Sequence, residues 1–169
     1  IQRMHDIQQR IVQLGRAPVV VDMVVDGDPV ADQYVAIKQR RAHDAGIDFR
    51  VHRFASDVTT DDIIATINHA TASNEVDAMI VQLPLPDHLD TDLILNAIPL
   101  RCDVDVLSHQ ARELFYRGEP DFIMPTAQAV LYLLDSIDVN YDQKNFIVIG
   151  QGQLVGRPVA HLLRERGYH

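Results

Sequence analysis

The sequence predicts an α/β fold: a three-layer domain with a parallel sheet and helices on both faces, followed by the start of a Rossmann-type dinucleotide-binding domain. Three observations predict this. Apolar β-branched runs alternate with stretches of helical periodicity, turn residues separate them, and the last such run leads into a glycine-bearing turn. The expected strands are Pro18–Val25, Asp48–Phe54, Ala78–Gln82 and Lys144–Ile149. The expected helices are Ile1–Leu14, Pro29–Ala45, Thr60–Ala72, Asp92–Ala97, Thr126–Asp135 and Val155–Arg166.

The elements of the first half begin and end at residues with known preferences. The first apolar residues recur at helical spacing until Gly15 ends the run. Pro29 follows turn residues and suits the first turn of the next helix, which Gly46 closes. Thr59 or Thr60 is the expected N-cap of the third helix. These signals predict a regular strand–helix alternation up to the third strand.

The second half is less regular. The run Leu83–Pro86 ends the third strand, because proline cannot donate to a sheet ladder. Between Pro99 and Pro125 the pattern weakens, which predicts a long loop of the kind that is often functional. The last strand, turn and helix open a dinucleotide unit, and a complete unit needs further strands. We therefore expect a first domain over 1–125, a connecting helix over 126–139, and the first βα unit of an incomplete nucleotide-binding domain over 140–169.

Composition excludes several classes of function. The 169 residues carry 24 acidic and 15 basic side chains, and this net charge of −9 argues against nucleic acid as a partner. Hydrophobic residues make up 47%, enough for a core. No apolar run approaches roughly twenty residues, so no membrane span is expected. The single cysteine fits a reducing, cytoplasmic compartment, and a chain starting at Ile1 without a signal-peptide pattern is expected to be part of a longer product.

Tyr34, Lys38 and Gln82 are the first candidate site residues. Tyr34 and Lys38 lie four residues apart and so share one face of a helix. Such a pair is either an aromatic ring packed on a surface lysine or a platform for a planar ligand beside a catalytic ammonium. Gln82 ends a strand just before a proline turn, where open parallel sheets bind ligands. The alternative for Gln82 is a side chain that bonds only its own loop.

Asp103 and Asp105 form an acidic pair two residues apart. Such a pair can cap a turn, ligate a metal or bind a polar heterocycle. No histidine or cysteine stands at a ligand spacing from it, so we predict no metal site. Cys102, next to the pair, has no Cys-His arrangement around it that would make it a nucleophile.

The segment Gly150–Gly156 follows an apolar run and precedes a helix. Glycines in this context let the backbone approach a phosphate, and a helix N-terminus attracts the anion. The third glycine comes one residue later than in the common fingerprint, and a plain tight turn is the alternative. The expected cofactor-binding residues are Gly150, Gln151, Gly152, Gln153, Val155 and Gly156.

Taken together, these motifs resemble the methylenetetrahydrofolate dehydrogenase/cyclohydrolase family over nearly the whole chain. The motifs that carry the resemblance are Val25–Pro29, Tyr34-x-x-x-Lys38, Val81–Pro86, Asp103-Val-Asp105, Gly118-Glu-Pro120, Pro125-Thr126 and the Gly150 turn. Their order is that of the family. The resemblance implies oxidation of 5,10-methylenetetrahydrofolate with NAD(P)⁺ and hydrolysis of the methenyl product to 10-formyltetrahydrofolate, in one-carbon metabolism and purine biosynthesis.

The resemblance also implies a role for each residue. Lys38 is the expected catalytic lysine of the cyclohydrolase step, and Gln82 is expected to hydrogen-bond it. Tyr34 is expected to stack on the aminobenzoyl part of the folate. Asp105 is expected to bind the pterin, with Leu83 and Pro84 also lining the substrate site. The four catalytic candidates Tyr34, Lys38, Gln82 and Asp105 are expected to line one cleft.

Three positions depart from the family pattern. Val106 stands where the family usually has glycine, residues 124–127 differ at the turn between the domains, and Gln151 replaces an arginine that would favour a 2′-phosphate. The cofactor is therefore NADP or NAD, with NADP favoured by the resemblance. A homodimer is the expected assembly. Two alternatives stay open: another two-domain NAD(P)-dependent dehydrogenase of amino-acid or shikimate type, and a non-catalytic folate- or nucleotide-binding relative.

Overall fold

A computed structural model describes residues 2–137 and 145–168 of the chain. The chain forms two compact units, Ile1–Asp103 and Val104–His169. Unit 1 contains α1 (Gln2–Leu14), β1 (Val19–Val25), α2 (Pro29–Ala45), β2 (Asp48–Phe54), α3 (Thr60–Ala72), β3 (Ala78–Val81), α4 (Thr91–Ala97) and the 3₁₀ turn η1 (Leu100–Cys102). Unit 2 contains α5 (His109–Tyr116), α6 (Pro125–Asp135) and α7 (Gly156–Glu165).

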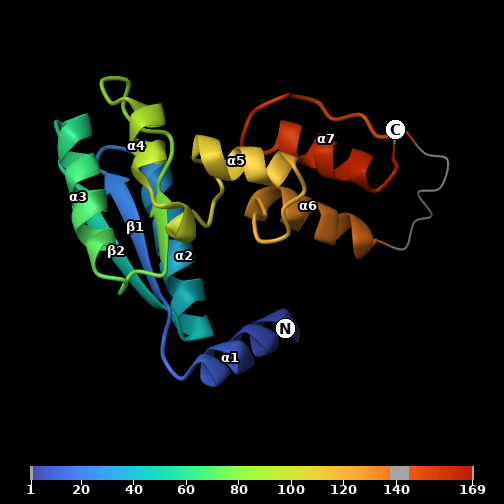
Figure 1. The fold of residues 1–169 in the computed structure, drawn as a ribbon, viewed down its shortest axis with the longest axis horizontal. Helices are drawn as coiled ribbons and strands as arrows, with labels where there is room; N and C mark the ends of the chain where they lie inside the picture. The colour runs from blue at the N-terminus through green and yellow to red at the C-terminus, as the bar shows by residue number, and fades with distance from the viewer. Residues whose placement is uncertain (1, 138–144, 169) are drawn as a thin grey trace. The chain divides into compact units, whose positions relative to one another are not determined.

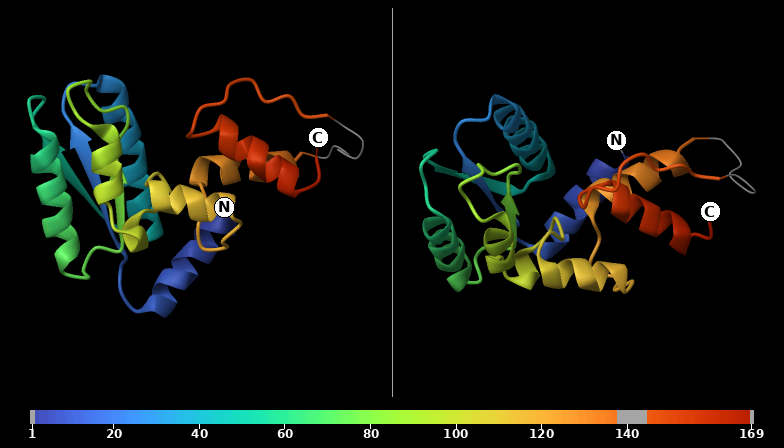
Figure 2. Two further views of the ribbon diagram at one scale, coloured as in Figure 1. Left: turned by 45° about the horizontal axis from the view of Figure 1, so that its top comes forward. Right: turned by 90° about the horizontal axis from the view of Figure 1, so that it is seen from above.

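Unit 1 is a three-layer α/β domain, as the sequence predicts. Its sheet has the strand order β2–β1–β3, and both strand pairs are parallel. α2 and α3 lie on opposite faces of the sheet (Figures 1 and 2). The connection from β1 to β2 runs toward one edge of the sheet, and the connection from β2 to β3 runs back toward the other edge. When both crossovers are right-handed, their helices therefore lie on opposite faces.

The core of unit 1 lies around β1, the central strand. Met23 and Val24 point to opposite faces of the sheet and are 2% and 1% exposed. Both neighbouring helices cover apolar surface, with Val35 on α2 and Ile67 on α3 buried. A strand covered on both faces reads as a continuous apolar run, which is why the sequence predicts it well.

The polar residues at the helix ends explain where α2 and α3 begin. The Asp28 carboxylate accepts from the Val30 N–H at 2.8 Å, and the Thr59 hydroxyl accepts from the Asp62 N–H at 3.2 Å. Gly46 ends α2 in the left-handed region at a φ of 84°, which glycine adopts without a steric cost. The predicted bounds of α2, β2 and α3 are confirmed.

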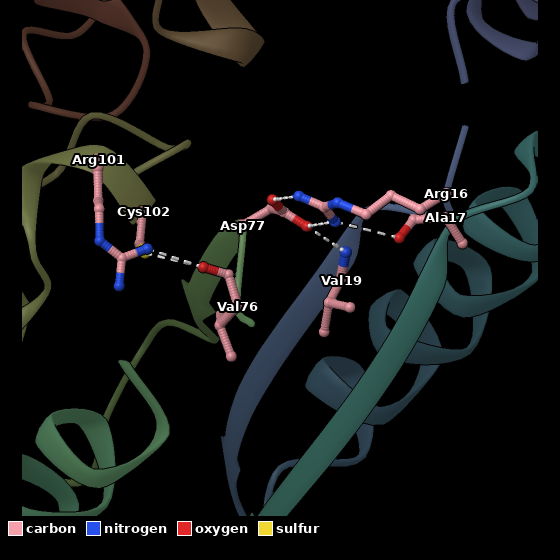
Figure 3. A network of polar contacts seen from close by, with 7 residues as sticks. All are labelled: Arg16, Ala17, Val19, Val76, Asp77, Arg101 and Cys102. Atoms are coloured by element: carbon pink, nitrogen blue, oxygen red, sulfur yellow. Dashed lines mark hydrogen bonds and ion pairs between the residues drawn. The ribbon is translucent and has the colours of Figure 1, made fainter. Parts of the chain in front are cut away.

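An ion-pair network ties the start of β1 to the start of β3 (Figure 3). Both guanidinium nitrogens of Arg16 contact the Asp77 carboxylate, at 2.6 and 2.5 Å, and the same carboxylate accepts from the Val19 N–H at 2.8 Å. These bonds lower the pKa of Asp77 to about 2. Nearby, Arg101 donates to the carbonyls of Val76 and Thr71, at 2.9 and 2.7 Å, and so closes the carboxyl end of α3.

The prediction of one long loop over Pro99–Pro125 is wrong, because η1 and α5 lie within it. Ser108 caps α5 by accepting from the Ala111 N–H at 3.3 Å. Ala111 and Phe115, four residues apart, are the buried side chains of this helix. Eight residues with only two buried positions give a periodic signal too weak to predict a helix.

The predicted strand Lys144–Ile149 is also wrong over the residues that the structure describes. Residues 145–150 form no strand, and Lys144 lies outside the described residues. A strand needs a hydrogen-bonded neighbour, and no described segment pairs with this run. The two helices predicted for the end of the chain form within one residue of their expected bounds. α6 packs against α7, and Arg166 pairs with Asp135 at 2.5 Å.

Candidate active site

Lys38 and Gln82 meet at the carboxyl end of β3. The Lys38 ammonium donates to Gln82 Oε1 at 2.8 Å across 44 positions of sequence. Gln82 Nε2 in turn donates to the Leu83 carbonyl at 2.9 Å, which sets the orientation of the amide toward the lysine. The structure therefore brings together the two residues that the resemblance pairs.

The position of Gln82 follows from the sheet topology. Its N–H donates to the Met23 carbonyl at 2.9 Å, so it extends the pairing of β3 with β1 by one residue. The chain passes from β1 to β2 on one side and then crosses back to β3 on the other side of β1. The direction in which strands are added therefore reverses between β1 and β3. Open α/β sheets bind ligands at such a switch point, at the carboxyl ends of the strands. The lysine–amide pair stands at this end of the sheet.

A third residue, Asp22, contacts the same lysine. Its Oδ2 lies 2.7 Å from Lys38 Nζ, and its side chain is completely buried in the middle of β1. Burial raises the pKa of Asp22, and the nearby Lys38 and Arg53 cations lower it by less. Neither carboxylate oxygen has a well-aligned hydrogen bond among the described residues, so the ion pair is its main compensation for burial.

Asp22 is not among the site residues predicted from the sequence. The signal that was available is one acidic residue inside the apolar run that forms β1. A charged side chain in a strand buried on both faces needs a partner, and the partner here is the proposed catalytic lysine. A search for charges inside predicted buried strands would have found it.

Tyr34 stands one helical turn before Lys38 on α2, and its side chain is 60% exposed. An exposed ring of this kind presents a flat apolar face to a planar ligand. Leu83 is half-buried and Pro84 is exposed, directly after Gln82. These substrate-site candidates therefore lie in unit 1 with Lys38.

The acidic pair spans the boundary between the two units. Asp103 is buried and its backbone bridges to Met79 of β3, whereas Asp105 belongs to unit 2 and is half-buried. Whether Asp105 shares a cleft with Lys38 stays a prediction. Val106 has a φ of 58°, in the left-handed region where a β-branched residue is strained. This backbone agrees with the glycine that the family usually has there.

The glycine turn of unit 2 is tightly folded at one end and open in the middle. A Cβ on Gly156 would lie 2.1 Å from the Gly150 carbonyl oxygen, so only glycine fits there. Gly150 adopts a φ of 95°. A Cβ on Gly152 would meet nothing within 4 Å, which leaves open space beside the backbone just before α7. Glycines with this close approach and open space suit a phosphate of a dinucleotide.

A cavity of about 550 Å³ adjoins this turn. Its wall is mostly apolar and combines the turn with side chains of α6 and α7. The residues that line it are Val130, Val148, Ile149, Gly150, Gly152, Gln153, Leu154, Val155, Gly156 and Val159. The predicted cofactor residues of the turn thus line one hollow, apart from Gln151.

Other kinds of site find less support in the described part of the chain. No group of three or more His, Cys, Asp or Glu side chains there could hold a metal ion. Cys102 is completely buried, and burial raises the pKa of its thiol, which opposes a nucleophilic role. Among the helices described, none combines the length and the apolar character that a bilayer crossing requires.

Unit 1 is a parallel three-layer domain with a lysine–amide pair at its switch point, and unit 2 contains a glycine turn and helix of nucleotide-binding type. These features define a class of two-domain α/β proteins. Family comparison makes the assignment specific. Residues 2–105 match the tetrahydrofolate dehydrogenase/cyclohydrolase catalytic domain, and residues 124–169 match the NAD(P)-binding domain of the same proteins. The chain belongs to the tetrahydrofolate dehydrogenase/cyclohydrolase family.

Curated relatives agree with this assignment. The bifunctional protein FolD of Lacticaseibacillus paracasei is 33% identical over 161 residues, which are 94% of this chain and 57% of that protein. The FolD protein of Anaplasma phagocytophilum is 35% identical over 150 residues, 88% of this chain and 49% of the relative. The chain thus spans about half the length of the curated relatives it matches.

Solved structures show the same fold. The FolD methylenetetrahydrofolate dehydrogenase/cyclohydrolase of Campylobacter jejuni superposes with a TM-score of 0.90 at 28% identity, over 99% of this chain and 60% of that one. The Trypanosoma brucei enzyme, solved with NADP and an inhibitor, gives a TM-score of 0.88 at 25% identity, over 95% and 57% of the two chains. The fold class predicted from the sequence is confirmed.

Proposed function

We propose that the intact protein oxidises 5,10-methylenetetrahydrofolate with NAD(P)⁺ and hydrolyses the methenyl product to 10-formyltetrahydrofolate. The observation that carries the proposal is the contact of Lys38 with Gln82 at the switch point of the sheet, in a chain of the dehydrogenase/cyclohydrolase family. Family membership favours this activity over an amino-acid or shikimate dehydrogenase. The intact Lys38–Gln82 pair favours it over a non-catalytic relative.

Lys38 supplies the chemistry of the hydrolytic step. Water adds to the methenyl carbon and the bond from that carbon to N5 then breaks; one proton of the water ends on N5 and the other is released to solvent, which leaves the formyl group on N10. An ammonium at Lys38 can stabilise negative charge that develops on oxygen as the adduct forms and breaks. Gln82 holds this ammonium through its amide oxygen, so the donor is already oriented before substrate binds.

The same unit offers surfaces for the flat parts of the folate. Tyr34 would stack on the aminobenzoyl group, since its ring is exposed on the helix face that carries Lys38. Leu83 and Pro84 would line the adjacent wall. Asp105 would accept two N–H groups from the edge of the pterin, which is the geometry a carboxylate favours.

The glycine turn would hold the dinucleotide. Gly150 and Gly152 leave the backbone accessible, Gly156 lets the turn close tightly on the start of α7, and Gln151, Gln153 and Val155 lie beside them. When bound, the nicotinamide would accept hydride from the methylene carbon of the folate. Gln151 is uncharged, so the selection of a 2′-phosphate must come from other groups of the protein.

Substitution of Lys38 tests the proposal directly. In the intact protein, Lys38→Ala should abolish hydrolysis of methenyltetrahydrofolate, followed by its absorbance. Arg40→Ala, a cation on the exposed side of the same helix, is the matched control and should hydrolyse normally. Normal turnover in Lys38→Ala, or none in the wild type, would refute the cyclohydrolase assignment.

Gly152→Ala tests the cofactor turn without disturbing the fold. The added methyl group meets no atom within 4 Å, so the thermal midpoint should stay unchanged. If a phosphate occupies that space, calorimetric affinity for NADP⁺ and NAD⁺ should fall at least about tenfold, which is about 1.4 kcal/mol. Unchanged affinity for both would show that the nucleotide binds elsewhere.

We further propose the organisation that the family resemblance implies for the intact protein. Residues 1–125 would form the catalytic domain, 126–139 the connecting helix and 140–169 the first part of the nucleotide domain. The protein would be a cytoplasmic homodimer and supply one-carbon units for purine biosynthesis. Sedimentation of the intact protein tests the dimer.

A further inference from the structure

Asp22 is a buried charge in an unfavourable place. It lies in the centre of the central strand, between Val51 of β2 and Ile80 of β3 in the register of the sheet. Its side chain is completely buried, and an isolated carboxylate there is strongly disfavoured. A valine in this position would suit the strand better. The residue therefore needs an explanation beyond the stability of the fold.

The explanation lies in the lysine that it contacts. A lysine ammonium has three N–H bonds. One is donated to Gln82 Oε1 at 2.8 Å, and the ammonium also forms an ion pair with Asp22, whose Oδ2 lies 2.7 Å from Nζ; the Lys38 side chain is 30% exposed. These two partners hold Nζ from the protein side, and the partly exposed lysine remains accessible to a ligand.

Few other ionisable groups face Asp22. β2 contributes Arg53, whose guanidinium is held by Asp26 and Asp32 at 2.9 and 2.8 Å. At the end of β3, the neighbour of Lys38 is Gln82, which has no ionisable group. α2 contributes Lys38, with Tyr34 one turn away. Lys38 is the only one of these groups in contact with the carboxylate among the residues described.

We propose that Asp22 is a positioning residue for Lys38: its carboxylate, 2.7 Å from Nζ, holds the lysine against Gln82. This proposal rests on the cyclohydrolase function proposed above. It assigns Lys38 the role of a charged donor in hydrolysis and opposes the role of a neutral base, because a buried carboxylate at 2.7 Å favours the charged amine. Asp22 itself touches no reacting atom.

Removing the charge while keeping the shape tests this role. In the intact Asp22→Asn protein, the alkaline limb of the pH–rate profile for methenyltetrahydrofolate hydrolysis should move to lower pH by about one unit. Acylation of Lys38 by acetic anhydride near neutral pH, quantified on the Lys38 peptide by mass spectrometry, should become about tenfold faster. The second readout does not depend on activity.

Asp77→Asn is the matched control. Asp77 is another ion-paired aspartate of unit 1, and it lies near the opposite end of β1, beside Val19. Its removal should lower stability and leave both the pH profile and Lys38 acylation unchanged. Asp22→Val provides a second test with a residue that suits the strand, in case the asparagine variant does not fold.

The outcomes separate the two proposals. A wild type without hydrolysis ends the proposed function, and the acylation rates still decide the role of Asp22. An active wild type whose pH profile and Lys38 acylation are unchanged in Asp22→Asn and Asp22→Val overturns the positioning role alone. Equal shifts in Asp77→Asn would also overturn it, because the effect would then be one of general destabilisation.

Discussion

Two apolar runs of this chain, Val19–Val25 and residues 145–150, differ in the burial of their side chains. In β1, Met23 and Val24 are 2% and 1% exposed, with a paired strand on each side. In the second run, Ile147 and Ile149 are 87% and 95% exposed, and no described segment pairs with it. Similar composition therefore yields a buried strand only where neighbouring strands and helices are available to cover it.

The contrast extends to charge. β1 contains Asp22, a fully buried carboxylate, whereas the second run is entirely apolar between Phe146 and Ile149, although both of its isoleucines are exposed. Hydrophobicity alone thus does not decide burial among the described residues. A sheet that is otherwise well packed can retain one unfavourable residue where that residue has a partner such as Lys38.

Matched isoleucine substitutions should show the largest difference between the two units. Ile67→Ala removes a fully buried side chain of α3 and should cost about 2–5 kcal/mol of unfolding free energy. Ile149→Ala should change it by less than about 0.5 kcal/mol in the 169-residue chain. Urea denaturation measures both. A cost above about 2 kcal/mol for Ile149→Ala would mean that this run is packed after all.

Asp22→Val would make β1 as apolar as the second run. It should stabilise the protein by about 1–3 kcal/mol near neutral pH, because it removes a buried charge while Lys38 keeps Gln82 and partial exposure to water. Thermal and urea unfolding measure the gain. A loss of stability would show that the ion pair more than compensates for its burial.

The stability that Asp22→Val adds should depend on pH, and the pKa of Asp22 sets the direction of that dependence. The folded-state pKa of Asp22 is raised above its ordinary value of 3.8, so the native state binds the proton more tightly than the unfolded state. Wild-type stability therefore falls as pH rises from 3.8 through the raised pKa. The advantage of Asp22→Val should be smallest in acid and reach its full size above that window.

The smallest effect is expected at the other end of β1. Asp77→Asn should cost about 1 kcal/mol at neutral pH, since the partner Arg16 is half exposed and water screens the pair. The pKa of Asp77 is lowered to about 2, so its contribution is complete above 3.8 and lost as pH falls toward 2. Urea unfolding at neutral and acid pH should give a difference that disappears in acid.

Local signals account for what could be predicted. The bounds of α2, β2 and α3 are correct because Asp28 and Thr59 act as caps through their own side chains and Gly46 supplies a left-handed residue. α5 was missed because its cap, Ser108, precedes only eight helical residues. The second apolar run was assigned to a strand because periodicity cannot reveal whether a neighbour exists.

Sequence by itself determined the α/β class, the ends of α2 and α3, and the candidates Tyr34, Lys38, Gln82 and the glycine turn. Each of these depends on residue type and short spacing. Only the tertiary structure decided that Lys38 meets Gln82 across 44 residues, that Asp22 meets Lys38, and that residues 145–150 remain unpaired. These outcomes depend on sheet order and burial, which arise from contacts between distant segments and leave little trace in the local pattern.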